Sequence, residues 1–177
     1  MIAGFLLALI GHGVIGALDV LINHELIAKV PRQTAAAREQ CLHGARELVF
    51  AALFGALAWA EWHGALALAI AALLAAELAI STVDQVLELD IRLLPVTERA
   101  AHAVLFVNLG IIIALLGQQL LAWAALPSAL VRVDHGWASW VLSALAIAAL
   151  AWSVRDGLAA FKLLRRSRAE ATQGNTV

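Results

Sequence analysis

The chain has 177 residues, of which 63% are hydrophobic and 14% charged, and its mean hydropathy is +0.87. Soluble domains contain about 45–50% apolar and about 25% charged residues, so the composition predicts an integral membrane protein in a single domain. The net charge of −1, without a basic stripe interleaved with aromatic residues, argues against a nucleic-acid partner. A single cysteine, Cys41, excludes an intrachain disulfide and a cysteine-based zinc site.

The hydropathy pattern predicts five membrane-spanning helices, each near the roughly 20 residues that a bilayer requires. In chain order they cover residues 2–22, 41–60, 65–83, 100–121 and 137–154. The expected fold is an all-α integral membrane protein, in which the first four helices form a four-helix bundle from two repeated hairpins. We expect residues 1–168 to form the transmembrane domain and residues 169–177 a disordered C-terminal tail.

Basic residues alternate between the connections and predict an orientation. Lys29, Arg32 and Arg38 lie in the first connection, Arg92 and Arg99 lie in the third, and the tail is basic, whereas the second and fourth connections are nearly neutral. The positive-inside rule then places the N-terminus outside and the C-terminus in the cytoplasm, as in a bacterial inner membrane. Tryptophans give the same orientation, because five of them fall where an outer aromatic belt is expected: Trp59, Trp62, Trp123, Trp137 and Trp140.

The first two helices carry ionisable groups at membrane depth. Asp19 lies at the inner end of the first helix, seven residues after His12, so the two share a helical face. The second helix begins with Glu39-x3-His43, and Glu47 continues the same face. Such groups are costly in a bilayer, so they usually face the bundle interior and pair or bind ions.

The next two helices repeat this arrangement. Glu77, Asp84 and Glu88 lie on one face of the third helix, and the fourth begins with Glu98-x3-His102. Four helices therefore bring carboxylates, and two of them a histidine as well, to one depth. The fifth helix shows almost no polar group to bury, so we expect it to pack against the bundle or a second subunit.

The two halves of the chain also resemble each other. A shift of 65 residues takes His12 to Glu77, Asp19 to Asp84 and Glu25 to Asp90. Parallel repeats of this kind often place a site at their interface.

A simpler interpretation remains open for single residues. Glu39 and Glu98 begin helices, where the helix dipole favours acids, and nearby arginines offer ion pairs. This interpretation is weaker for His43 and His102, which lie deeper in the predicted membrane.

Carboxylates and imidazoles without thiols suit iron, manganese or zinc, and such a set in a four-helix core suits a pair of ions. The pattern resembles the ferritin-like di-iron carboxylate class, in which two helices each give a Glu and two each give a Glu-x-x-His. The resemblance implies two metal ions, with Glu39 and Glu98 as bridging or chelating groups and His43 and His102 each capping one ion. The expected metal ligands are Asp19, Glu39, His43, Asp84, Glu98 and His102. This chain has Glu-x3-His in place of Glu-x2-His, so the resemblance is confined to the motif and identifies no membrane family.

These expectations favour an intramembrane metal-dependent oxidoreductase with two iron ions, zinc or manganese remaining open. A site inside a membrane implies a lipid-soluble substrate, such as a fatty-acyl, isoprenoid, quinone or sterol-like molecule. Glu47 and Glu88 are the expected catalytic residues; if the metal is zinc, one of them would act as general base for metal-bound water in a hydrolysis. A redox partner and a homo-oligomer remain open.

Four alternatives use parts of the same set. A magnesium-dependent lipid diphosphate enzyme would use Asp84, Glu88 and Asp90, with Arg92 and Arg99 on the phosphates. A zinc hydrolase, a metal-ion or proton transporter, and a haem protein with axial histidines are the others. The sequence leaves open whether five further residues take part: His12, His24, Glu25, Glu77 and Asp90.

Overall fold

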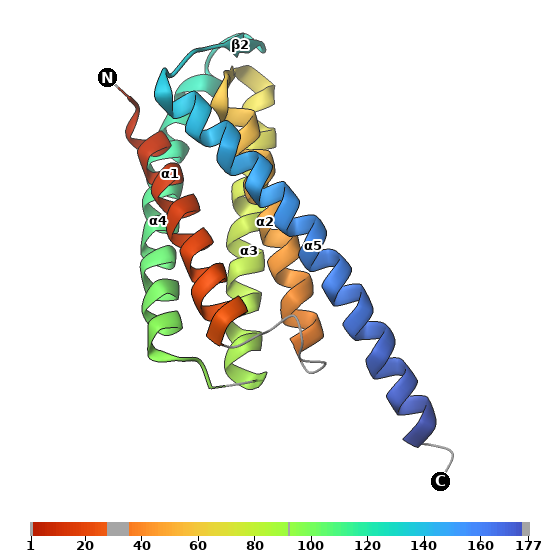
Figure 1. The fold of residues 1–177 in the computed structure, drawn as a ribbon. Helices are drawn as coiled ribbons and strands as arrows, with labels where there is room; N and C mark the ends of the chain where they lie inside the picture. The colour runs from red at the N-terminus through yellow and green to blue at the C-terminus, as the bar shows by residue number, and fades with distance from the viewer. Residues whose placement is uncertain (1, 28–35, 92, 175–177) are drawn as a thin grey trace.

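A computed structural model describes residues 2–27, 36–91 and 93–174, with five long helices (Figure 1). The first is α1 (Gly4–Asp19), which continues as the π-helix η1 (Val20–Ile27). The others are α2 (Ala37–Ala58), α3 (Ala67–Ile91), α4 (Val96–Ala124) and α5 (Trp137–Gly174). A 3-10 turn, η4 (Gly64–Leu66), and two short strands, β1 (Ala60–Trp62) and β2 (Leu130–Arg132), lie in the connections.

All five helical segments are long and apolar enough to cross a membrane, which confirms the predicted all-α class. The helices extend further than the hydropathy pattern predicts at the end where the carboxylates lie. The apolar stretches stop at the first charged residues, whereas the helices continue through them to Ile27 and Ile91. The tail expected to be disordered from residue 169 is helical as far as Gly174, and residues 175–177 lie outside the described residues.

The helix contacts form a ring. α1 packs along α4, α4 along α3, α3 along α2, and α5 along α2, where the contact is the most extensive, and along α1. Within the described residues, α1 and α2 are not among the extensively packed pairs, although they form the first expected hairpin. The fifth helix therefore closes the bundle between α1 and α2.

The α2–α5 contact is close because Gly44 exposes its backbone. A Cβ atom at this position would lie 3.3 Å from the backbone nitrogen of Gly157. The Ser153 hydroxyl donates a hydrogen bond of 2.7 Å to the Gly44 carbonyl oxygen. This contact buries Asp156 of α5 to 2% exposure, so the expectation that the fifth helix buries almost no polar group is wrong.

The two connections expected at the outer face pair with each other. β1 and β2 form an antiparallel ladder in which Glu61 faces Val131. Gly64 follows with a φ of 58°, and a side chain there would collide with Ser128, whose hydroxyl accepts a hydrogen bond from the Ala65 nitrogen. The five tryptophans predicted to form a belt lie in or next to these strands and the adjoining helix ends.

The bundle interior has two chemically different halves. The half near the strands is an apolar core that includes Leu6, Leu53, Ile70, Ile112 and Leu116, each at most 1% exposed. The other half contains buried ionisable side chains from α1 to α4, among them Asp19, Glu39, Asp84 and Glu98, each at most 3% exposed. The fold thus encloses a polar cluster at one end of an otherwise apolar bundle.

Candidate metal centre

The structure brings together seven of the eight predicted site residues. Each of the seven is at most 4% exposed: Asp19, Glu39, His43, Asp84, Glu88, Glu98 and His102. The eighth, Glu47, lies on the same helix as His43 and lines a neighbouring cavity. We call the seven residues, together with His24, the polar cluster.

His24 is the cluster member that the sequence left undecided, and the π-helix explains why. His24 follows Asp19 by five positions, which places the two about 140° apart around an α-helix of 3.6 residues per turn. A helix with i→i+5 hydrogen bonding has more residues per turn, so residues five positions apart lie closer to one face. η1 begins directly after Asp19, and His24 Nε2 lies 3.6 Å from Asp19 Oδ2 and 3.2 Å from Glu98 Oε1. No residue type in this segment signals the π-helix, so α-helical periodicity could not include His24.

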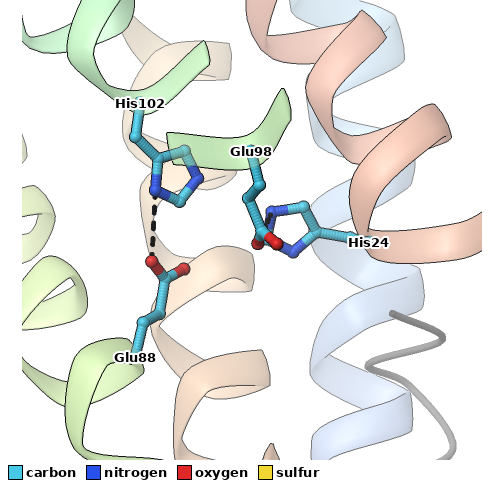
Figure 2. A group of neighbouring side chains, drawn as sticks. All are labelled: His24, Glu88, Glu98 and His102. Atoms are coloured by element: carbon cyan, nitrogen blue, oxygen red, sulfur yellow. Dashed lines mark ion pairs between the residues drawn. The ribbon is translucent and has the colours of Figure 1, made fainter. Parts of the chain in front are cut away.

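Glu88 of α3 connects two histidines that belong to different helices. Its Oε1 lies 3.3 Å from His43 Nε2 of α2, and its Oε2 lies 3.2 Å from His102 Nδ1 of α4. Figure 2 shows Glu88 and His102 pointing toward each other beside the Glu98–His24 pair. A carboxylate whose two oxygens face two different histidines has the geometry of a bridging ligand.

Asp19 is held by a short chain of hydrogen bonds. Asn23 Nδ2 donates to Asp19 Oδ1 at 2.6 Å, and the Thr97 hydroxyl donates to Asn23 Oδ1 at 2.7 Å. The other carboxylate oxygen, Oδ2, therefore faces the cluster, 3.2 Å from His102 Nε2. Outer hydrogen bonds of this kind orient metal-binding carboxylates in proteins.

Asp84 has two different partners on α2. Arg46 Nη1 donates to Asp84 Oδ2 at 3.1 Å, and His43 Nε2 lies 3.3 Å from the same oxygen. The remaining oxygen, Oδ1, is buried and has no hydrogen-bond partner among the described residues. Asp84 thus keeps one oxygen available for a further ligand.

Several close contacts in the polar cluster are at or beyond the usual length of an N–H···O hydrogen bond. Four buried atoms take part in contacts of 3.2–3.6 Å: Asp19 Oδ2, His24 Nε2, Glu88 Oε2 and His102 Nε2. Nitrogen and oxygen atoms of different helices therefore converge on a small buried volume.

Ligand atoms in the cluster are close enough to share ions. Atoms of His24, Glu88, Glu98 and His102 lie within 4.8 Å of one another, as do those of His43, Asp84 and Glu88. Opposite ligands of one zinc or iron ion are about 4.4 Å apart at bond lengths near 2.2 Å. Glu88 belongs to both groups, and a third group joins Glu39 to His24 and His43. The donor set therefore fits two ions that share a carboxylate.

The charges of the polar cluster also require compensation. Five buried carboxylates face one guanidinium, that of Arg46, and three histidines across the described residues. Uncompensated buried charge is costly, so the remaining negative charge requires protons on these groups or bound cations.

A second polar layer lies between the polar cluster and the apolar core. His12 is stacked on Phe50 with ring centroids 4.5 Å apart, and its Nδ1 lies 3.2 Å from Asn108 Nδ2. The Ser81 hydroxyl donates to Glu77 Oε1 at 2.5 Å, and Glu77 is fully buried. His12 and Glu77 therefore lie outside the three ligand groups.

The other undecided residues face elsewhere. Glu25 forms an ion pair with Arg155 of α5, and Asp90 is exposed. For the diphosphate alternative, the structure buries Asp84 and Glu88 but exposes Asp90 and Arg99, and Arg92 lies outside the described residues.

A cavity of about 300 Å³ adjoins the polar cluster. Its lining includes Glu88 and His102 of the cluster, and most of its wall is apolar, including Phe50, Leu105 and Leu145. All five helices contribute to the wall, so the cavity connects the apolar interior with the candidate ligands.

The chain was compared with protein families, curated proteins and solved structures. No protein-family model matches the chain, and neither curated proteins nor solved structures give a match.

Proposed function

We propose that the protein is an intramembrane metal-dependent oxidoreductase whose polar cluster binds two metal ions, iron by preference, and acts on a lipid-soluble substrate. The observation that carries the proposal is the three groups of buried His, Asp and Glu ligand atoms, within each of which the atoms lie no more than 4.8 Å apart. Glu88 belongs to two of these groups, as a carboxylate between two ions would.

Different residues of the polar cluster would bind the two metal ions. His24, Glu98 and His102 would hold one ion, His43 and Asp84 the other, and Glu88 would bridge them. Glu39 lies beside His24 and His43, and Asp19 lies beside His24 and His102, so these two carboxylates would complete the set. Iron held by carboxylates and histidines supplies oxygen-dependent redox chemistry.

Further residues would position the ligands and handle protons. Asn23 would fix the Asp19 carboxylate, and Arg46 would fix that of Asp84. Glu47 lines the cavity with one buried oxygen, Oε2, that no described residue hydrogen-bonds, so it would exchange a proton with a bound substrate.

A lipid-soluble substrate fits the cavity and the surface of the bundle. The cavity wall is mostly apolar, and the helices expose large apolar side chains such as Leu68, Val107 and Ile147. We propose that these helices span the membrane with the N-terminus outside and the polar cluster toward the cytoplasm. The basic residues at the far end of α5, which projects beyond the other helices in Figure 1, support this orientation.

Metal content tests the proposal. The full-length protein, purified in detergent after growth with iron, should contain about two metal ions per chain by elemental analysis. His24→Ala and Glu88→Gln should each lose most of this metal, because the first removes a ligand and the second a bridging charge. His63→Ala is the matched control, since His63 pairs with Glu61 at the opposite end of the bundle.

Redox activity is tested separately. Iron-loaded protein in lipid nanodiscs should consume oxygen when reduced, and mass spectrometry should find an oxidised lipid-soluble product. Metal-free protein, or full metal retention in both cluster variants, refutes the metal site. Bound zinc with no oxygen consumption refutes the oxidoreductase and leaves the hydrolase.

Metal-ion or proton transport is the second candidate function. Glu77 favours it, because this carboxylate is fully buried beyond the polar cluster and its Oε2 has no hydrogen-bond partner among the described residues. Glu77 and His12 would extend a polar path toward the outer face. Metal or proton uptake into proteoliposomes that is abolished by Glu77→Leu would establish transport.

A further inference from the structure

Two residues that line the cavity beside the polar cluster each carry a buried polar atom without a partner among the described residues. Trp152 Nε1 of α5 and Glu47 Oε2 of α2 are both buried, and both lack a hydrogen-bond partner in the described part of the chain. Both residues line the cavity. The indole N–H is a donor only, and a carboxyl oxygen without a proton is an acceptor.

A hydroxyl head group has both the acceptor that Trp152 Nε1 requires and the donor that Glu47 Oε2 requires. A hydroxyl accepts a hydrogen bond from the Trp152 N–H and donates its own proton to Glu47. A carboxylate would meet the acidic groups of Glu47, Asp84 and Glu88 on the same wall, where Arg46 is already paired with Asp84. An unsubstituted hydrocarbon would leave both polar atoms unsatisfied in the cavity, which is costly.

The rest of the cavity suits an apolar chain. On α5 the lining extends from Leu145 to Trp152, about 10 Å of helix at 1.5 Å per residue. Gly16 of α1 keeps the opposite wall open, since a Cβ there would contact nothing within 4 Å. Leu21 and Phe106 line the cavity and are also 44% and 36% exposed, so it reaches the lipid-facing surface of the bundle.

We propose that this cavity binds a long-chain alcohol, with its hydroxyl between Trp152 and Glu47 and its chain between α1 and α5. The inference rests on the proposed function in treating the bound molecule as the substrate, and it narrows that substrate to an uncharged amphiphile. The head group then lies at the end of the cavity where Glu88 and His102 contribute to the wall.

Photo-crosslinking tests the site directly. The probe is a dodecan-1-ol derivative with a mid-chain diazirine, added to the full-length protein in phosphatidylglycerol nanodiscs. Peptide mapping should place the label on the cavity-facing parts of α1 and α5. Dodecan-1-ol should compete with the probe at least tenfold better than dodecanoate or dodecane. Equal competition by dodecanoate, or labelling spread over the outer surface, overturns the proposal.

Matched variants test the two parts of the site. Ala149→Phe should abolish labelling because Ala149 lines the cavity, whereas Ala151→Phe, on an exposed position outside the lining, should not. Trp152→Phe keeps an aromatic side chain but removes the indole N–H, so it should weaken competition by dodecan-1-ol about three- to tenfold and leave that by dodecane unchanged. Undiminished labelling of Ala149→Phe, or no effect of Trp152→Phe on the alcohol, contradicts the assignment.

Metal analysis of the same samples separates the two proposals. Specific labelling of protein that contains no metal would support the alcohol site and refute the proposed metal enzyme. Two metals per chain without specific labelling would refute the alcohol site and leave the metal centre standing.

Discussion

Replacing Asn23 by leucine removes the hydrogen bond that fixes Asp19 without touching a proposed ligand. Asn23 is 3% exposed, donates to Asp19 Oδ1 at 2.6 Å and accepts from the Thr97 hydroxyl at 2.7 Å. Leucine is of similar size, so the main change is that the Asp19 carboxylate can rotate and the Thr97 hydroxyl loses its acceptor. The variant therefore tests the orientation of the Asp19 carboxylate while Asp19 itself remains in the protein.

The expected effect is on metal affinity. Loss of a hydrogen bond that orients a ligand typically weakens metal binding about 10- to 100-fold. This corresponds to about 1.4–2.8 kcal/mol at 1.4 kcal/mol per tenfold change. Asn23→Asp should weaken binding more, because it places a second carboxylate beside Asp19 and removes the donor.

Competition for Co²⁺ with a chromophoric chelator measures the affinity of the detergent-purified variants. Asn108→Leu is the control, because Asn108 donates to the Ala8 carbonyl oxygen in the second polar layer and not to the cluster. Its Co²⁺ affinity should equal that of the parent protein. An Asn23→Leu affinity within twofold of the parent, or an equal loss in Asn108→Leu, would refute the role given to this hydrogen bond.

Three further predictions concern the fold and its orientation. Gly44→Leu should destabilise the protein by about 1–3 kcal/mol in a denaturant titration, because its Cβ would press on the α5 backbone; a neutral effect contradicts that contact. Ile112→Ala, a truncation in the apolar core, should cost about 2–5 kcal/mol while metal content per folded chain stays constant; loss of metal would show that the two halves are not separate. In a Cys41→Ser background, a membrane-impermeant maleimide should label Asp134→Cys from outside the cell and Ser167→Cys only after the membrane is opened; the reverse pattern would invert the topology.

The sequence predicted helix content and burial well because both follow from composition and spacing. Hydropathy located five segments that are long and apolar enough to span a bilayer. The cost of a charge in lipid placed the carboxylates inside, and the seven predicted cluster residues are all buried.

The arrangement of helices could not be predicted in the same way. Hydropathy shows which segments are apolar but not which apolar faces meet. Gly44 determines one contact, since only the absence of its side chain lets α5 approach α2 so closely. The β1–β2 pairing joins two connections distant in sequence, and neither short segment shows a strand pattern.

His24 shows where helical periodicity failed as a guide. An α-helical spacing groups Asp19 with His12 and turns His24 away from both. The π-helix after Asp19 changes the spacing of residues that share a face. No residue type in this segment predicts a π-helix. The oxidoreductase, its metals and its substrate stay predictions, because they depend on ligands that the chain alone does not contain.

X-ray absorption spectroscopy on iron-loaded protein tests the central claim most directly. The proposal predicts a first shell of nitrogen and oxygen only, scattering from imidazole rings, and a second iron about 3.5–4 Å away. Glu88→Gln should remove the iron–iron feature, because this carboxylate faces both His43 and His102. Sulfur ligands, a single isolated iron, or an iron–iron feature that survives in Glu88→Gln would contradict the shared metal centre.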